Sequence, residues 1–482
     1  MHVIATYSRN AQAAGGVRLR APRLAARRTP RRTALTIALA LLVLLLLAAE
    51  AQAYVPGQLL WAGRIGTSTS GAGAWAVAAG PNGATAIAGW KHVASTGQTP
   101  MVARYNAAGT KWIRTLASPG YAEAVAFDND GNVYVAATIN PSAGGDIAVS
   151  KYSASGVWQW TQTYDGGGTY DSAQEMAVDP SGNVVVVGTG NVGTGTGIVV
   201  LKYDATGTMA WPAAARYDPP ADPDAGSRYV GDLALDAAGD IYLVGSSETR
   251  VGGVWVQSAM VLKFAGADGA RTGGWLYEPL HAPDSSFDGV SVRGSAVVAV
   301  GETFDLAGVT AGDALVVKFD RSLVQQSQNE WGAGNATGEW FGDVVLDGRG
   351  NVFVTGSQWL SGTRGYERAV TMKLNASLSK VLWKATYLPK SRDAEGWYIA
   401  RDGLGSIFVG GIKDVAGGLE DFLTIKYSPA GKLTWLRTWS GGGPEDDDPA
   451  GLVLGTKSGV YIGGHVTGKG DSSQAVLLKY RR

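Results

Sequence analysis

The sequence predicts an all-β fold, an eight-bladed β-propeller of four-stranded antiparallel blades, from three observations. From about residue 74 to its end the chain repeats a unit of roughly 50 to 57 residues, a period typical of propeller blades. Each unit contains two pairs of alternating apolar strands, each pair joined by a glycine turn. The chain has 69 Gly and 16 Trp and few charged residues, which is typical of short strands joined by tight turns.

The first half of each unit is a strand, a turn and a second strand, as in AEAVAFDNDGNVYVAA from Ala122. In this turn Asp128 stands three residues before Gly131, where the carboxylate can bond the turn backbone and glycine can adopt positive φ. The second half, such as IVVLKYDATGTMAW from Ile198, supplies the third and fourth strands. Weaker copies of the first half start near residues 287, 341, 395 and 449.

Two side chains recur with the period of the repeat. A basic residue lies in every third strand, and a tryptophan lies at one site of seven of the eight fourth strands: Trp61, Trp112, Trp160, Trp211, Trp275, Trp383 and Trp435. A large ring at the same site of each blade is expected to pack between neighbouring blades. Because one active site needs groups that are not repeated, we interpret these periodic residues as scaffold.

The last repeat lacks its fourth strand, because the chain ends at QAVLLKYRR. A matching strand, GQLLWAGRI from Gly57, lies at the other end of the repeats and has the same spacing from Gly to Trp as GKLTW from Gly431. We therefore expect residues 57–66 to complete the last blade. This closure would remove the open strand edges that invite aggregation.

Residues 1–53 have the pattern of a secretory signal peptide. An arginine-rich stretch precedes the apolar run TALTIALALLVLLLLAA, which ends at Ala51-Gln52-Ala53, a small-x-small cleavage site. Residues 54–482 would then be the propeller, in a secreted, periplasmic or cell-surface protein. The alternative is an uncleaved membrane anchor, although the run is shorter than the roughly 20 residues that span a bilayer.

Charge and cysteine content exclude several partners and chemistries. The chain has 41 basic and 41 acidic residues, of which residues 1–53 hold eight Arg and one Glu, so the remainder has 33 bases, 40 acids and a net charge of −7. An acidic body argues against nucleic acid, which needs a basic patch. With no cysteine, disulfides, thiolate metal sites and thiol nucleophiles are excluded. We expect a monomer that contacts membrane only through an uncleaved leader.

The repeat resembles a known family. The run YDGGGTYDSAQEMAVDPSGNVVVVG from Tyr164 is similar to the SBBP-type β-propeller repeat of bacterial secreted proteins, and the resemblance covers nearly all of the chain after the leader. It implies a secreted or surface propeller and brings no catalytic residues with it.

A second resemblance is shorter. YDATGTMAW from Tyr203 is similar to the Thr-Gly-x-x-x-Trp motif of eight-bladed quinoprotein dehydrogenases, which bind pyrroloquinoline quinone and calcium on the ring axis. Only this repeat has both Thr206 and Gly207. A quinone-dependent oxidoreductase is therefore an alternative function.

Catalytic motifs are sparse. No HExxH, P-loop or GxSxG motif follows the leader, and His92, His281 and His465 belong to three different repeats. Glu445, Asp446, Asp447 and Asp448 form an acidic stretch before the last inner strand. Their oxygens would suit Ca²⁺, the one cofactor that the sequence suggests, but they lack the alternating spacing of a calcium loop. A solvated acidic turn is the alternative interpretation.

Unequal connections predict which face binds a ligand. In a four-stranded blade the first-to-second and third-to-fourth connections lie on one face of the ring, which here carries uniform glycine hairpins. The other connections lie on the opposite face and are long and dissimilar; we call this the long-loop face. Variable loops on a rigid scaffold are a common place for binding. The candidate ligand-binding residues there are Trp90, His92, Tyr121, Tyr170, His281, Trp340, Trp359 and Trp397, beside Asp447.

Exposed aromatic rings beside acids suit a sugar or a peptide. The sequence therefore predicts a non-catalytic binding or scaffold module for a carbohydrate or protein ligand. The alternative function for the same surface is that of a polysaccharide hydrolase or lyase that uses loop carboxylates.

Overall fold

The computed structural model describes residues 55–67, 70–167, 170–191, 196–218, 225–251, 253–277, 284–304, 312–332, 338–360, 366–390, 392–415, 419–443, 445–456, 459–468 and 472–482. The chain divides into two compact units, Met1–Val55 and Pro56–Arg482. All named strands belong to the second unit. The expected signal peptide, residues 1–53, lies outside the described residues.

The first four blades are consecutive four-stranded sheets. Blade 1 is β2 (Ala72–Ala79), β3 (Thr85–Val93), β4 (Gly97–Tyr105) and β5 (Lys111–Thr115). Blade 2 is β6 (Gly120–Phe127), β7 (Val133–Ile139), β8 (Asp146–Tyr152) and β9 (Trp158–Tyr164). Blade 3 is β10 (Asp171–Val178), β11 (Val184–Asn191), β12 (Thr196–Tyr203) and β13 (Ala215–Tyr217). Blade 4 is β14 (Ala225–Leu235), β15 (Ile241–Val251), β16 (Val254–Phe264) and β17 (Arg271–Leu276).

The next three blades repeat this order. Blade 5 is β18 (Asp284–Arg293), β19 (Ala296–Phe304), β20 (Asp313–Phe319) and β21 (Gln325–Trp331). Blade 6 is β22 (Glu339–Leu346), β23 (Val352–Leu360), β24 (Tyr366–Leu374) and β25 (Val381–Tyr387). Blade 7 is β26 (Ala394–Arg401), β27 (Ile407–Asp414), β28 (Glu420–Tyr427) and β29 (Leu433–Trp439). Two short 3-10 turns, η1 (Pro81–Gly83) and η2 (Pro141–Ala143), lie in connections.

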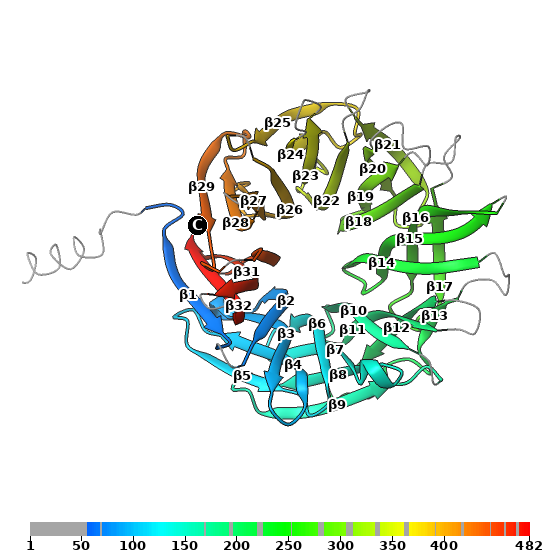
Figure 1. Ribbon diagram of the computed structural model, residues 1–482. Helices are drawn as coiled ribbons and strands as arrows, with labels where there is room; N and C mark the ends of the chain where they lie inside the picture. The colour runs from blue at the N-terminus through cyan, green and yellow to red at the C-terminus, as the bar shows by residue number, and fades with distance from the viewer. Residues whose placement is uncertain are drawn as a thin grey trace, which may run out of the picture. The chain divides into compact units, whose positions relative to one another are not determined.

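Blade 8 joins the two ends of the repeat region. Its order is β30 (Asp448–Leu454), β31 (Gly459–Gly468), β32 (Ser472–Arg481) and then β1 (Leu59–Ile65). β1 pairs antiparallel with β32, with Trp61 opposite Lys479 and Ile65 opposite Ala475. The prediction that residues 57–66 complete the last blade is confirmed. Consecutive inner strands contact one another from β2 to β30, and β30 contacts β2, so the second unit is a closed eight-bladed propeller (Figure 1).

The periodic tryptophans pack between blades, as predicted. Trp160 of blade 2 donates from Nε1 to the Ala205 carbonyl of blade 3 at 3.1 Å, and Trp112 of blade 1 donates to Ala154 of blade 2 at 3.1 Å. Six of the seven indoles cover a turn glycine of the next blade, where a Cβ on Gly156 or Gly207 would lie 2.8 Å from the ring. Trp275 is the exception, because it lies two residues further along its strand and Gly273 faces the basic residue Lys263 instead. These rings are scaffold.

The periodic basic residues of the third strands are also structural. Lys202 forms an ion pair with Asp179 of its own blade at 2.8 Å and donates to the Gly266 carbonyl of the next blade at 2.6 Å. Asp179 also accepts the backbone N–H groups of Ser181 and Asn183 in the turn, as its position before Gly182 predicts.

The long connections are partly strands. The segment from Lys91 to Pro100 is one of the connections of the long-loop face, and most of it is strand: β3 and β4 pair from Thr85 opposite Tyr105 to Val93 opposite Gly97. In blade 4, β15 and β16 pair as far as Val251 opposite Val254. These hairpins extend because alternating residues continue the ladder beyond the blade. In the part of the chain that the structure describes, there is no helix of a length and apolar character that could cross a membrane.

Candidate functional site

Every inner strand carries a β-bulge at the same place. The pairing register between the first and second strands shifts by one residue in each of the eight blades. The extra residue varies between blades: Trp75, Glu123, Gln174, Gly231, Asp288, Gly342, Trp397 and Ala450. The residue before it is buried in every blade, whereas the bulge residues are partly or fully exposed. Bulges re-aim side chains, and here they do so on the strands nearest the ring axis (Figure 1).

Glycines of the second strands make room for these bulges. In seven blades a glycine lies opposite the residue before the bulge: Gly89, Gly188, Gly245, Gly301, Gly356, Gly411 and Gly464. A Cβ at any of them would lie 1.8 to 2.1 Å from the carbonyl oxygen two residues before the bulge. Blade 2 has Ala137 at this place. The repeat therefore encodes the shape of the inner strand and leaves the bulge residue free to vary.

Aromatic side chains gather where blades 1 to 3 meet the axis; we call Trp75, Trp90, Tyr121 and Tyr170 the aromatic arc. Trp75 and Tyr121 have ring centroids 4.9 Å apart, and the Tyr121 and Tyr170 hydroxyls are 2.8 Å apart. Trp90 lies over Gly73 of its own inner strand, where a Cβ would be 2.5 Å from the indole nitrogen. Trp75 is 38% exposed and Tyr170 is 41% exposed, so both offer free ring surface.

Carboxyl groups gather at the long-loop end of blades 5 to 8; we call Asp288, Glu302, Glu367, Glu395, Glu420, Asp446 and Asp448 the acidic arc. Burial raises the pKa of Glu302 to about 8, with further contributions from Asp288 and Glu367. Burial also raises the pKa of Glu395 to about 7, with further contributions from Glu367 and Glu420. The Trp397 indole donates to Glu395 Oε2 at 2.8 Å, so an aromatic ring is fixed within the acidic arc.

Further carboxyls lie deeper along the axis, on the residue after the bulge. Burial, followed by Asp232 and Glu123, raises the pKa of Glu175 to about 8. Burial and Asp232 raise the pKa of Asp343 to about 7. Asp232 and Asp343 belong to blades 4 and 6, on either side of blade 5, and the charge of Asp232 contributes to the raised pKa of Asp343. We call the bulge residues and Glu175, Asp232, Asp343 and Tyr398 the axial surface.

Two of these deep carboxylates also connect blades. Asp232 accepts the N–H of Val290 in blade 5 at 2.8 Å, and Asp343 accepts the N–H of Ile399 in blade 7 at 2.8 Å. Tyr398 continues the pattern and donates to the Pro449 carbonyl of blade 8 at 3.2 Å. These three residues hold neighbouring inner strands together and present a polar wall.

The acidic stretch considered for calcium does not converge. Glu445 accepts from Thr467 at 3.1 Å, Asp446 accepts the Glu420 N–H at 3.0 Å, and Asp447 accepts the Gly441 N–H at 2.5 Å. Asp448 lies opposite His465 in the β30–β31 pair. Among the described residues no group of three or more His, Asp or Glu side chains could hold a metal ion.

The structure brings together only part of the set of residues expected to bind. Trp90, Tyr121, Tyr170, Trp340 and Trp397 lie on or against inner strands, and Trp340 packs over Gly342. Trp359 is 41% exposed at the end of β23, opposite Glu367. His92 is exposed at the tip of the β3–β4 hairpin. His281 lies outside the described residues.

Asp447 lies in the connection before β30, as expected, but its side chain is buried. It is 2% exposed and fastens the glycine-rich connection before β30, just as Asp171 accepts the Gly166 N–H at 2.6 Å before β10. Its carboxylate is therefore part of the framework of the long-loop face. The hydroxyl of Thr206, which carried the quinoprotein resemblance, bonds Asp204 in its own turn at 2.7 Å.

Sequence reasoning missed Trp75, Glu123, Glu175, Asp288, Asp343 and Glu302. Residues that recur in every blade had been assigned to the scaffold. The bulge position also recurs in every blade, but the residue type at that position varies. A comparison of the repeats site by site would have found the signal, because the site one residue after Ala122 of blade 2 holds an aromatic, acidic, amide or small residue depending on the blade.

No known protein family matches the chain, and no curated protein matches it. Solved structures with similar arrangements include the polysaccharide lyase Uly1, with 11% identity over 89% of this chain and 94% of that one and a TM-score of 0.46. The β-propeller domain of the Trilobed protease from Pyrococcus furiosus has 9% identity over 74% and 95% of the two chains and a TM-score of 0.44. The α-L-arabinanase of Penicillium chrysogenum has 7% identity over 63% and 91%, with a TM-score of 0.36. Likenesses this distant say nothing about function.

Proposed function

We propose that this protein is a non-catalytic β-propeller that binds a neutral or amino-substituted carbohydrate on the axial surface, at the long-loop end. The observation that carries the proposal is the bulge position. One backbone geometry, repeated in eight blades, presents side chains that vary between blades: Trp75 and Trp397 are aromatic, Glu123 and Asp288 are acidic, and Gln174 is an amide.

The chemistry of the two arcs suits sugars. Aromatic faces such as Trp75 give apolar area for the C–H face of a pyranose, and sites of this kind add a few polar groups that fix orientation. Carboxyls with a pKa near 7 to 8, such as Glu395 and Glu302, are partly protonated at neutral pH. They can therefore both donate and accept hydrogen bonds with hydroxyl groups. An anionic polysaccharide would be repelled by the acidic arc.

The carboxyl geometry supports binding over hydrolysis. Glycoside hydrolysis uses two carboxyls about 5 to 9.5 Å apart, with room between them for the sugar or water. Glu395 instead accepts the Trp397 indole N–H at 2.8 Å and lies close enough to Glu367 for that carboxyl to raise its pKa. Their arrangement fits recognition of a hydroxyl or amino group.

Secretion is part of the same proposal. It is supported by the leader pattern of residues 1–53 and by the resemblance of the repeats to the SBBP-type propellers of bacterial secreted proteins. A carbohydrate ligand would then be met outside the cytoplasm.

A glycan array probed with the full chain tests the proposed function. We expect binding to neutral or amino-sugar glycans that is lost in the Trp75→Ala/Trp397→Ala double variant. Asn132→Ala is the matched control, because Asn132 bonds Asp128 in a hairpin on the opposite face at 2.7 Å. If the native chain bound lysine-rich peptides on an array and no glycan, the proposed ligand would have to be a basic protein segment instead of a carbohydrate.

A further inference from the structure

A second candidate site lies at the outer rim, between blades 1 and 2. There the end of β5 and its connection to β6 face β8 and β9 across a cavity of about 290 Å³. Its lining is Thr115, Leu116, Ala117, Ser118, Ile139, Ala148, Tyr152, Trp158, Thr161 and Thr163. We propose that this cavity binds one neutral pyranose ring, stacked on Trp158, independently of the axial surface.

The blade repeat is interrupted at this cavity by polar residues. Ser150 stands immediately before the basic residue of the third strand, a place held by an apolar residue in the other seven blades: Ala103, Leu201, Leu262, Val317, Met372, Ile425 and Leu478. Ser150 is fully buried, and a buried hydroxyl is costly unless it is hydrogen-bonded. A polar residue at this otherwise apolar site therefore points to a role other than packing.

Ser150 orients the exposed tryptophan. Its hydroxyl is 2.9 Å from the Thr161 hydroxyl, which in turn accepts from Trp158 Nε1 at 3.0 Å. The Trp158 side chain is thereby held by its polar edge although it is 60% exposed. An immobilised aromatic ring binds at a smaller entropic cost than a freely rotating one.

Polar groups around the ring are available and uncharged. Thr115, Ser118 and Thr163 line the cavity and make no side-chain hydrogen bond with the described part of the chain. None of the ten lining residues is charged. A ring with a free face and several unpaired hydroxyls suits an uncharged polyol, because each hydroxyl can both donate and accept.

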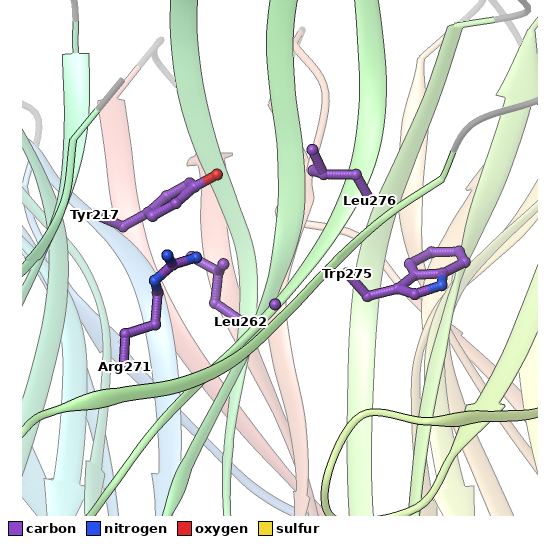
Figure 2. A pocket seen from close by; sticks show the side chains of 6 residues that line it. Tyr217, Leu262, Arg271, Trp275 and Leu276 are labelled. Atoms are coloured by element: carbon purple, nitrogen blue, oxygen red, sulfur yellow. The ribbon is translucent and has the colours of Figure 1, made fainter. Parts of the chain in front are cut away.

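The equivalent cavity between the outer strands of blades 3 and 4 serves as a comparison, because its residues pack against one another. Its cavity of about 300 Å³ is lined by Tyr217, Leu262, Arg271, Gly274, Trp275 and Leu276. Figure 2 shows Arg271 beside the Tyr217 ring, 4.9 Å from its centroid, and Arg228 lies 5.8 Å from the same ring. There Leu262 takes the place of Ser150, and the residue paired with it is Gly274, whereas Ser150 pairs with Thr161. Cations cover the aromatic ring of this cavity, so it offers no comparable stacking surface.

The test is calorimetric titration of the full chain with the methyl glycosides of glucose, galactose, mannose and N-acetylglucosamine, with glucuronate as the charged comparison. We expect at least one neutral glycoside to bind and glucuronate not to bind at this cavity. Trp158→Ala should weaken that binding by about tenfold or more, as for loss of a central aromatic contact. Thr163→Val, which keeps the shape and removes a hydroxyl, should weaken it by a smaller factor.

Two controls separate this site from the axial one. Leu433→Ala removes an exposed side chain, 50% exposed, from the equivalent strand of blade 7 and should leave binding unchanged. The Trp75→Ala/Trp397→Ala variant should keep the Trp158-dependent binding. The rim proposal is overturned if no neutral glycoside binds, or if all binding survives Trp158→Ala. Loss of all binding in the axial variant would overturn it while leaving the axial proposal standing.

Discussion

Glu175 shows how single residues of the axial surface make stability depend on pH. Burial, Asp232 and Glu123 raise its pKa to about 8 in the folded protein, whereas a free Glu titrates near about 4.3. The folded state therefore holds the proton more tightly than the unfolded state. The protonated Glu175 therefore adds to the free energy of unfolding. This contribution is complete below about pH 4 and is lost as the pH rises through the folded pKa.

Glu175→Gln tests this linkage, because glutamine has a similar shape and no charge. We expect the melting temperature of the variant to exceed that of the native protein at pH 8.5 and to approach it at pH 5. Asp130→Asn, at an exposed hairpin carboxylate, is the control. If the melting temperatures of Glu175→Gln and the native protein changed with pH in the same way between pH 5 and 8.5, Glu175 would not be held in its neutral form.

Asp447 gives a second residue-scale prediction. Its carboxylate accepts the Gly441 N–H and is 2% exposed, so Asp447→Ala leaves a buried donor without its partner. Such losses cost about 1 to 3 kcal/mol. Chemical denaturation should show a lower free energy of unfolding, while Asp446→Ala, at an exposed carboxylate, should change it by less. Equal effects of the two variants would contradict the assignment of Asp447 to the framework.

Individual site residues were harder to predict than the fold. Trp90, Tyr121 and Trp397 could be chosen because aromatic residues stand out near strand ends. Glu302 and Glu367 could not, because their meeting depends on the spatial neighbourhood of blades 5 and 6, which one-dimensional spacing does not reveal. Asp447 was misjudged because a carboxylate in an acidic stretch looks solvated until the fold buries it.

At the scale of the strand, the glycine opposite the bulge lets the inner strand approach closely in seven of the eight blades. A Cβ on Gly356 would lie 1.8 Å from the Trp340 carbonyl oxygen, so the inner strand of blade 6 would have to move. We expect Gly356→Ala to lower the free energy of unfolding by about 1 to 3 kcal/mol, as for overpacking in a core. Gly403→Ala is the control, since nothing lies within 4 Å of its added Cβ. Equal stability of the two variants would contradict the role of the glycine.

The strands themselves followed from the sequence, but their ends did not. Alternation and Asp-to-Gly turns mark most strand pairs, because both are local. The β3–β4 hairpin runs on to Val93 and Gly97 through His92, Thr96 and Gln98, residues whose polarity favours a loop. Polar residues fit there because the hairpin projects beyond the blade and its ladder needs no buried face.

At the scale of the molecule, β1 makes the ring a single closed unit. Trp61 stacks on Tyr105 of blade 1 at 5.5 Å and pairs with β32 of blade 8. Trp61→Ala should cost about 3 kcal/mol, the low end for large-to-small changes, because the ring is only partly buried. Deletion of residues 54–66 should cause association through the exposed β32 edge. Unchanged melting temperature and a monomeric sedimentation profile for the deletion would contradict closure by this strand.

The most direct test of the central claim is the affinity of the full chain for its best array glycan, measured by calorimetry at pH 7 for the native protein and the Trp75→Ala/Trp397→Ala variant. The account predicts that the variant melts within a few degrees of the native protein and binds at least about tenfold more weakly. An unchanged affinity in a folded double variant would contradict an axial carbohydrate site.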